Sequence, residues 1–569
     1  MGQEAIVTDA RPDTVIFNAQ VLTVDVAGRA AQALAVKGNR VAAVGSSDDI
    51  LRLAGPNTRR LDVGGRTVVP GFIDTHAHLD REGLRRAYPD LQACRSIADV
   101  QEVVRRAAAD TPPGEWIVIL PPGQPPYHMA PEQSLAERRF PNRHELDAVA
   151  PDNPVWIRSI WGLWNNTPPF VHVLNSAGIR ACGITRHTPA PTSTVEIERD
   201  PATGDLTGRI LERHLWPAAE FTILRAAPRF THEVRLRALS EAMRLSAAAG
   251  TTSVFEGHGV AAELHKVYKE VHDAGEQTVR AYLPISLPPW QTLGEVEAML
   301  ADWAHYASGR GFGDEWLTIG GVYLEYGGHP EVAAATRAAW PYTGWAGFTE
   351  QCNDPDTYRT LCRLAARHRL RVATLGLAAT DAVLSIWEGV AQEYPIHDLR
   401  WVLVHGREME PARDYPRLAR LGCVVTTQPS SYLHRSGLAL ARSGIDPERL
   451  MAHRDYIAAG VPWALSSDNK PYWLMFTLWV AVTRRAMGVD VVVGPGQRVS
   501  VPEALRALTW AGAYASFAED RLGSLEVGKL ADLLVLSDDL LRIPPEALKD
   551  VRVELTMIGG RIVHGAERF

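Results

Sequence analysis

Apolar segments of strand length recur along the middle of the chain, each followed by a segment with helical periodicity. The amphipathic segments include THEVRLRALSEAMRLSAAAG and DPDTYRTLCRLAARHRL. Strands that are buried on both faces read as apolar throughout, and regular strand–helix alternation favours a parallel sheet. Eight such units predict an α/β fold, a (β/α)8 TIM barrel. The eight strands are expected to end near His76, Glu256, Ser286, Glu325, Thr374, His405, Gln428 and Asp468.

The two ends of the chain have a different pattern. Segments such as DTVIFNAQVLTVD and RVELTMIGGRIVHG alternate with period two between Gly and Asn turns, as short strands do. We therefore expect residues 1–69 and 522–569 to form one small composite β domain, a β-sandwich, around a barrel at 70–521. The interval at about 80–230 is too long for one crossover and predicts an inserted lobe near the barrel mouth.

The first barrel strand ends in two histidines. In VVPGFIDTHAHLD, His76 and His78 are two residues apart, so on a strand both side chains point to the same face. Neutral imidazoles are common ligands of zinc-like metals, and two of them supply half of a first coordination shell. Histidines also pair by chance, so the prediction of a metal site depends on further ligands elsewhere in the chain.

Other polar residues fall at the carboxyl ends of the predicted strands, where the active site of a barrel lies. They include Glu256, Glu325, His405 and Asp468. Three of them also have an ordinary structural interpretation. His405 can be a buried histidine with a satisfied hydrogen bond, Asp468 can cap the helix PYWLMFTLWV, and Glu325 can be a loop carboxylate that faces water.

Composition narrows the class of protein. The net charge is −7 without a long run of either sign, which argues against a nucleic-acid or polybasic membrane surface. No apolar stretch reaches 18 residues and the start has no signal-peptide pattern, so no membrane span is expected. Five scattered cysteines argue against a disulfide framework and favour a cytoplasmic location.

Several motifs, taken in order, resemble the amidohydrolase superfamily of metal-dependent hydrolases, and its amidohydrolase 3 branch in particular. The resemblance covers nearly the whole chain. It rests on VVPGFIDTHAHLD, PNRHELDAVAPDNPVWIRS, HVLNSAGI, RDPATGDLTGRILE, RWVLVHG, LSSD and PEALRALTWAGAYASFAEDRLGSLEVGKLADLLVLSDD. It implies a (β/α)8 barrel with a composite β domain, in agreement with the patterns above.

The resemblance also implies roles for particular residues. His76, His78 and Asp468 would bind a metal ion, with Asp468 as proton shuttle, and His405 would bind a second metal or polarise the substrate. Two positions depart from the family. The bridging lysine of strand four is missing from GGVYLEYGGHP, where Glu325 is the alternative ligand, and Thr374 replaces the histidine of strand five. The second metal site is therefore expected to lack its usual ligands.

The resemblance implies an enzyme that cleaves a carbon–nitrogen bond other than a peptide bond in a small apolar or aromatic molecule, through a metal-activated water. The expected cofactor is one divalent ion, zinc first, with manganese, iron or cobalt as alternatives. A deaminating, decarboxylating or non-catalytic protein on the same scaffold stays open. A homodimer is expected from the family. Candidate pocket residues are Thr374, His258, Trp161 and Trp164, although core packing explains tryptophans equally well.

Overall fold

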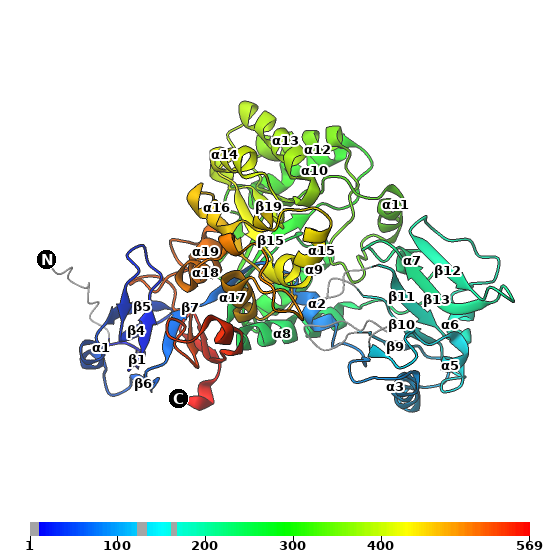
Figure 1. Ribbon diagram of the computed structural model, residues 1–569, viewed down its shortest axis with the longest axis horizontal. Helices are drawn as coiled ribbons and strands as arrows, with labels where there is room; N and C mark the ends of the chain where they lie inside the picture. The colour runs from blue at the N-terminus through cyan, green and yellow to red at the C-terminus, as the bar shows by residue number, and fades with distance from the viewer. Residues whose placement is uncertain (1–10, 122–133, 161–167) are drawn as a thin grey trace.

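The computed structural model describes residues 11–121, 134–160 and 168–569 (Figure 1). At its centre lies a nearly closed barrel of eight strands, all parallel to their neighbours, as the sequence predicted. In chain order, which is also their order around the barrel, the strands are β8 (Phe72–Ala77), β14 (Thr251–Glu256), β15 (Arg280–Ser286), β17 (Leu317–Tyr323), β18 (Val372–Leu375), β19 (Val402–Val404), β20 (Val424–Thr427) and β21 (Trp463–Leu465).

The first and last barrel strands approach each other at the mouth. The Thr75 hydroxyl donates a hydrogen bond to the carbonyl of Leu465 over 3.0 Å, and the backbone N–H of Asp468 donates to the carbonyl of His76 over 2.9 Å. These contacts bring two segments almost 400 residues apart in sequence side by side. They hold the carboxyl ends of β8 and β21 together, which is where the sequence places its candidate ligands.

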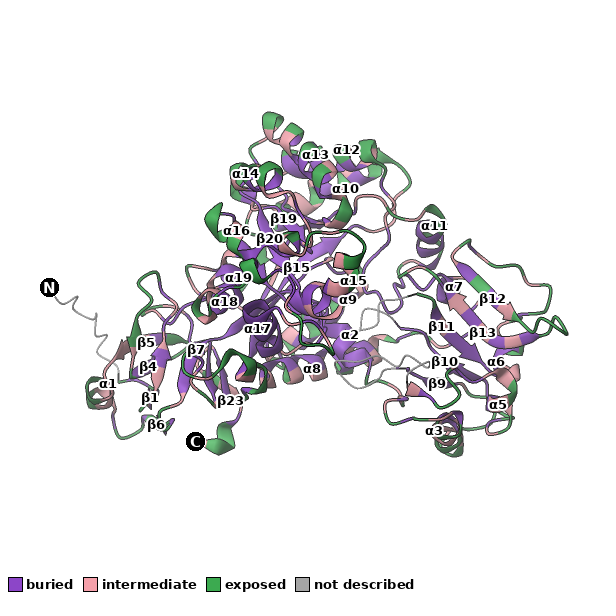
Figure 2. Ribbon diagram, in the orientation of Figure 1, coloured by how far each residue is buried: buried purple, intermediate pink, exposed green. Residues whose placement is uncertain are grey.

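Helices pack around the barrel with their apolar faces inward, so that buried residues line the centre in Figure 2. The segment at 355–367 shows how the sequence produces such an apolar face. Asp354 caps its N-terminus, and its buried residues recur at helical spacing, namely Tyr358, Leu361, Cys362, Ala365 and Ala366. The main surrounding helices are α8 (His232–Ala248), α9 (Ala262–Asp273), α10 (Leu293–Ala307), α12 (Pro355–Arg367), α13 (Thr380–Glu393), α14 (Pro411–Leu421), α16 (His453–Ala458) and α18 (Val501–Leu508).

The composite β domain is confirmed. Its six-stranded sheet joins both ends of the chain in the order β24 (Arg561–His564), β23 (Val553–Ile558), β22 (Leu533–Leu536), β7 (Thr67–Pro70), β2 (Gln20–Leu22) and β3 (Ala30–Ala31). A four-stranded sheet adds β5 (Arg40–Gly45), β4 (Ala33–Lys37), β1 (Thr14–Phe17) and β6 (Arg59–Asp62). On β22, Leu533 and Val535 pack into the domain's own core while Leu534 and Leu536 join the barrel core. This explains why that strand is apolar on both faces.

A buried ion pair joins the barrel to this domain, and we expect its loss to destabilise the protein. Arg280 on β15 donates two hydrogen bonds to Asp532, at 2.8 and 2.9 Å, and both side chains are almost fully buried. Replacing Asp532 with alanine leaves the guanidinium buried without its partner, which costs about 3–5 kcal/mol. Urea denaturation followed by circular dichroism measures this. The exposed pair Lys37–Asp13 is the control, and Lys37→Ala is expected to cost less than about 1 kcal/mol. Equal costs would contradict the prediction.

The long interval between β8 and β14 carries a five-stranded sheet of its own, seen on the right of Figure 1. Its strands, in spatial order, are β12 (Val195–Arg199), β13 (Leu206–Glu212), β11 (Phe170–Leu174), β10 (Val155–Ile157) and β9 (Ile117–Ile119). The domain limits drawn from the sequence stay a prediction. Among the described residues, no helix combines the length and apolar character needed to cross a lipid bilayer.

Candidate metal centre

His76 and His78 lie at the carboxyl end of β8, both buried, with their ring centroids 5.0 Å apart and the rings almost perpendicular. Strand geometry brings them together as the sequence predicted. The Glu256 carboxylate at the end of β14 lies behind His78, with 3.5 Å between Glu256 Oε2 and His78 Nδ1. That carboxylate is held by the Tyr268 hydroxyl at 2.6 Å and by the Leu79 N–H at 3.0 Å. It is placed to orient the His78 ring, as carboxylates behind metal-ligating histidines do.

Asp468 follows β21 and faces these histidines. Its Oδ1 lies 3.7 Å from His76 Nε2 and 3.5 Å from His78 Nε2, and its Oδ2 lies 3.8 Å from His405 Nε2. Its φ is +52°, a left-handed conformation that is costly for a residue other than glycine and that gathers at functional sites. The helix that follows, α17 (Leu474–Thr483), has Trp473 at its N-cap, so Asp468 does not cap it.

Lys470 is the charged partner of Asp468. Its ammonium donates to Asp468 Oδ2 over 2.5 Å, and both side chains are buried. Burial raises the pKa of Asp468, but the charge of Lys470 and a hydrogen bond from His78 outweigh this, so the pKa lies well below its usual value. The carboxylate is therefore ionised and can accept a proton or bind a cation.

His405 completes the mouth from the end of β19. Its Nδ1 lies 2.7 Å from the Tyr432 hydroxyl and its Nε2 lies 3.0 Å from His76 Nε2. Burial lowers the pKa of His405 to about 3, so the ring is neutral near pH 7. Neutral imidazole is the form that binds metals and donates single hydrogen bonds.

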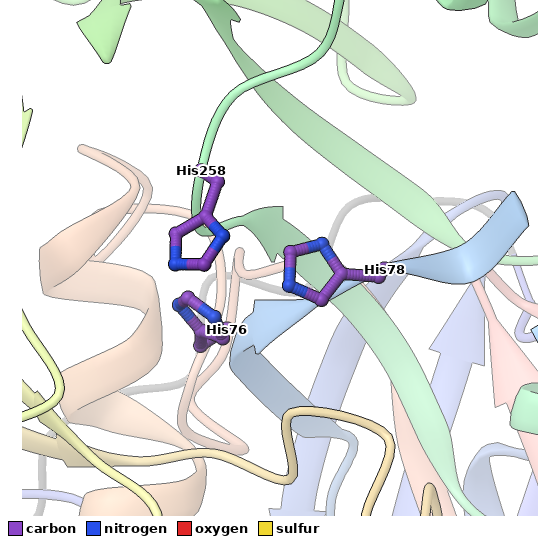
Figure 3. Close-up of side chains that lie close together, drawn as sticks. All are labelled: His76, His78 and His258. Atoms are coloured by element: carbon purple, nitrogen blue, oxygen red, sulfur yellow. The ribbon is translucent and has the colours of Figure 1, made fainter. Parts of the chain in front are cut away.

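Two overlapping groups of potential metal ligands result. Within the described part of the chain, one comprises His76, His78 and His258, and the other His76, His405 and Asp468. In each group the ligand atoms lie within 4.8 Å of one another. Figure 3 shows the first group, whose three rings face one another. Both nitrogens of His258 and Nδ1 of His76 are buried without a hydrogen-bond partner among the described residues. Nitrogen donors left without partners suit a divalent cation, so these residues fit the metal that the sequence implied.

The remaining candidates lie elsewhere. Neither group of described ligands contains Glu325, whose carboxylate accepts the Gln351 N–H at 2.8 Å. Burial and the nearby charge of Glu350 raise the pKa of Glu325 well above its usual value. Thr374 lies on β18 and is buried on the side that faces α12, where its hydroxyl is 2.8 Å from that of Tyr358. The structure therefore does not bring it to the histidines. Trp161 and Trp164 lie outside the described residues.

Sequence reasoning missed Lys470 and Tyr432 and assigned no role to Glu256. A lysine two residues after the candidate Asp468, in SSDNK, was a usable signal, because a short turn can fold it back on the carboxylate. Tyr432 carried no such signal, since its contact with His405 arises only from the packing of the segments after β19 and β20.

Comparisons with known proteins agree with this architecture. The model of the amidohydrolase family matches residues 60–564. The N-substituted formamide deformylase of Arthrobacter pascens is 29% identical over 96% of this chain and 97% of its own, and Protein LONG AFTER FAR-RED 3 of Arabidopsis thaliana is 25% identical over 96% and 91%. The crystal structure of an uncharacterized metal-dependent hydrolase from Pyrococcus furiosus shares the fold, with a TM-score of 0.66 and 22% identity over 93% of this chain and 100% of that one. The chain belongs to the amidohydrolase family of enzymes.

Proposed function

We propose that this amidohydrolase cleaves an amide or amide-like carbon–nitrogen bond in a small molecule, using a single divalent cation at the mouth of the barrel. The observation that carries the proposal is the convergence of the Asp468 carboxylate with the imidazoles of His76, His78 and His405. Four residues from three distant segments meet there.

The residues divide the chemistry between them. When bound, a divalent cation supplies the positive charge that makes water a nucleophile near neutral pH. Asp468, held ionised by Lys470, accepts the proton of the attacking water and passes it to the leaving nitrogen. His405, held by Tyr432, is placed to donate a hydrogen bond to the oxyanion that develops on the substrate.

The residues at the positions of the family's strand-four lysine and strand-five histidine favour a single cation over two. Tyr323 or Leu324 stands near the place of the strand-four lysine, and Tyr323 is buried with its ring 5.2 Å from that of His258. Thr374 takes the place of the strand-five histidine but contacts Tyr358 instead. The ammonium of Lys470 adds a fixed positive charge beside Asp468 Oδ2. Zinc is our first choice of metal, because imidazole and carboxylate ligands with an open position are typical of catalytic zinc.

The proposed substrate class is supported by a relative and by the surroundings of the centre. A relative of similar length is named an N-substituted formamide deformylase, so N-substituted formamides are the first substrates to test. The Phe348 ring lies 4.6 Å from the ring of His258 and 6.0 Å from that of His78, which supports an aromatic or apolar substituent. A homodimer and a cytoplasmic location remain predictions of the sequence.

The experiment is a hydrolysis assay of the purified, zinc-loaded protein on N-aryl and N-alkyl formamides and the matching acetamides. From the formamides we expect formate and the free amine to appear in equal amounts, faster with aromatic substituents. Asp468→Asn serves as the control and is expected to be inactive. No hydrolysis of any amide by the metal-loaded protein would contradict the proposal.

A further inference from the structure

His258 follows β14 directly, and its imidazole is unusual in this structure. Among the described residues it is the one histidine in which both ring nitrogens are buried without a hydrogen-bond partner. An unsatisfied buried donor or acceptor costs about 1–3 kcal/mol, and a neutral imidazole has one of each. An interaction with a bound cation would remove part of this cost.

The groups around His258 offer few partners for its two ring nitrogens. Aromatic rings lie on two sides, with Phe348 at 4.6 Å and Tyr323 at 5.2 Å between ring centroids. The histidines of β8 lie on the others, with His76 at 4.7 Å and His78 at 5.1 Å. The His405 ring also stacks on His258, with 5.7 Å between centroids. The two ring nitrogens are thus surrounded by aromatic groups and by the imidazoles that the proposed function places at the metal site.

The backbone at Gly257, the residue before His258, lies very close to the His76 ring. A Cβ atom at Gly257 would lie 1.7 Å from His76 Nδ1, far inside contact distance. Only glycine lets the chain directly after β14 approach the His76 ring so closely, and that approach places the next side chain, His258, beside both histidines.

We propose that His258 is a ligand of the divalent cation, which completes a three-imidazole set from β8 and β14 with His76 and His78. The ligand atoms of these three residues lie within 4.8 Å of one another. Three protein ligands and an open position make up the usual catalytic shell of zinc. The Asp468 carboxylate then keeps an oxygen for proton transfer. This inference rests on the proposed function, because it concerns the same cation.

The test uses cobalt, whose absorption spectrum reports its ligands, together with metal content per chain. We expect His258→Ala to weaken cobalt binding at least about tenfold, in competition with a chelator, and to change the visible bands. We expect His258→Cys to acquire the near-ultraviolet charge-transfer band of a cobalt–thiolate bond. The matched control is His265→Cys, since His265 is a half-buried histidine on α9 that belongs to neither ligand group. It should keep the wild-type spectrum.

Three outcomes would overturn the inference. If His258→Ala binds cobalt as the wild type does, His258 is not a ligand. If the variants lose affinity while His258→Cys shows no thiolate band, His258 only positions its neighbours. If the wild-type protein binds no divalent ion at all, the proposed function fails and the inference with it; the first two outcomes leave that function intact.

Discussion

Replacement of His76 by alanine is expected to remove the divalent cation and abolish hydrolysis. His76 belongs to both groups of potential ligands, and its ring lies within 5.0 Å of the rings of His78, His258 and His405. A cation contributes several kcal/mol of transition-state stabilisation, and about 4 kcal/mol corresponds to about a 1,000-fold loss of kcat/KM. Elemental analysis should find close to one ion per chain in the wild type and almost none in the variant.

The control for this experiment is His453→Ala. His453 is also fully buried, but it contacts Thr427 at 3.2 Å and belongs to neither group, so its variant should keep the ion. Retention of one ion in His76→Ala would show that the metal lies elsewhere. Two ions in the wild type would show that another group replaces the missing lysine, and the single-cation proposal would be wrong.

Replacement of Gly257 by alanine is expected to weaken metal binding almost as much as His76→Ala does, although Gly257 has no side chain at the site. The added Cβ would lie 1.7 Å from Nδ1 and 2.2 Å from Cε1 of His76, so the ring must leave its position. We expect metal affinity to fall by more than about 100-fold, the upper end of the effect of losing an outer-shell partner. We also expect lower stability, since overpacking a buried site costs about 1–3 kcal/mol. Metal titration and thermal denaturation measure the two effects.

A double variant separates displacement of His76 from general damage to the fold. In a His76→Ala background the clashing ring is absent, so Gly257→Ala should then cost little stability, which makes the two changes strongly non-additive. The matched control is Gly389→Ala on α13, where an added Cβ meets nothing within 4 Å. It should be neutral or stabilise the helix by up to about 1 kcal/mol. Additive effects of Gly257→Ala and His76→Ala would contradict this account.

The sequence by itself determined the barrel, because strand–helix alternation and strands apolar on both faces leave few other folds. It also determined that His76 and His78 lie close together, because side chains two residues apart on a strand share a face. Asp468 and His405 could be named because parallel strands present all their carboxyl ends at one mouth.

The tertiary structure alone decided which residues join them. On β18, Ala373 and Leu375 belong to a cluster shared with β14, β15, β17 and β19, so the residue between them, Thr374, points to the opposite face. Pairing of β14 with β8 shifts register between Val254 and Glu256, and the chain then turns over His76 at Gly257. The position of His258 depends on that shift. A register shift or a left-handed turn changes where a side chain points without changing the residue pattern, and only the packed structure records it.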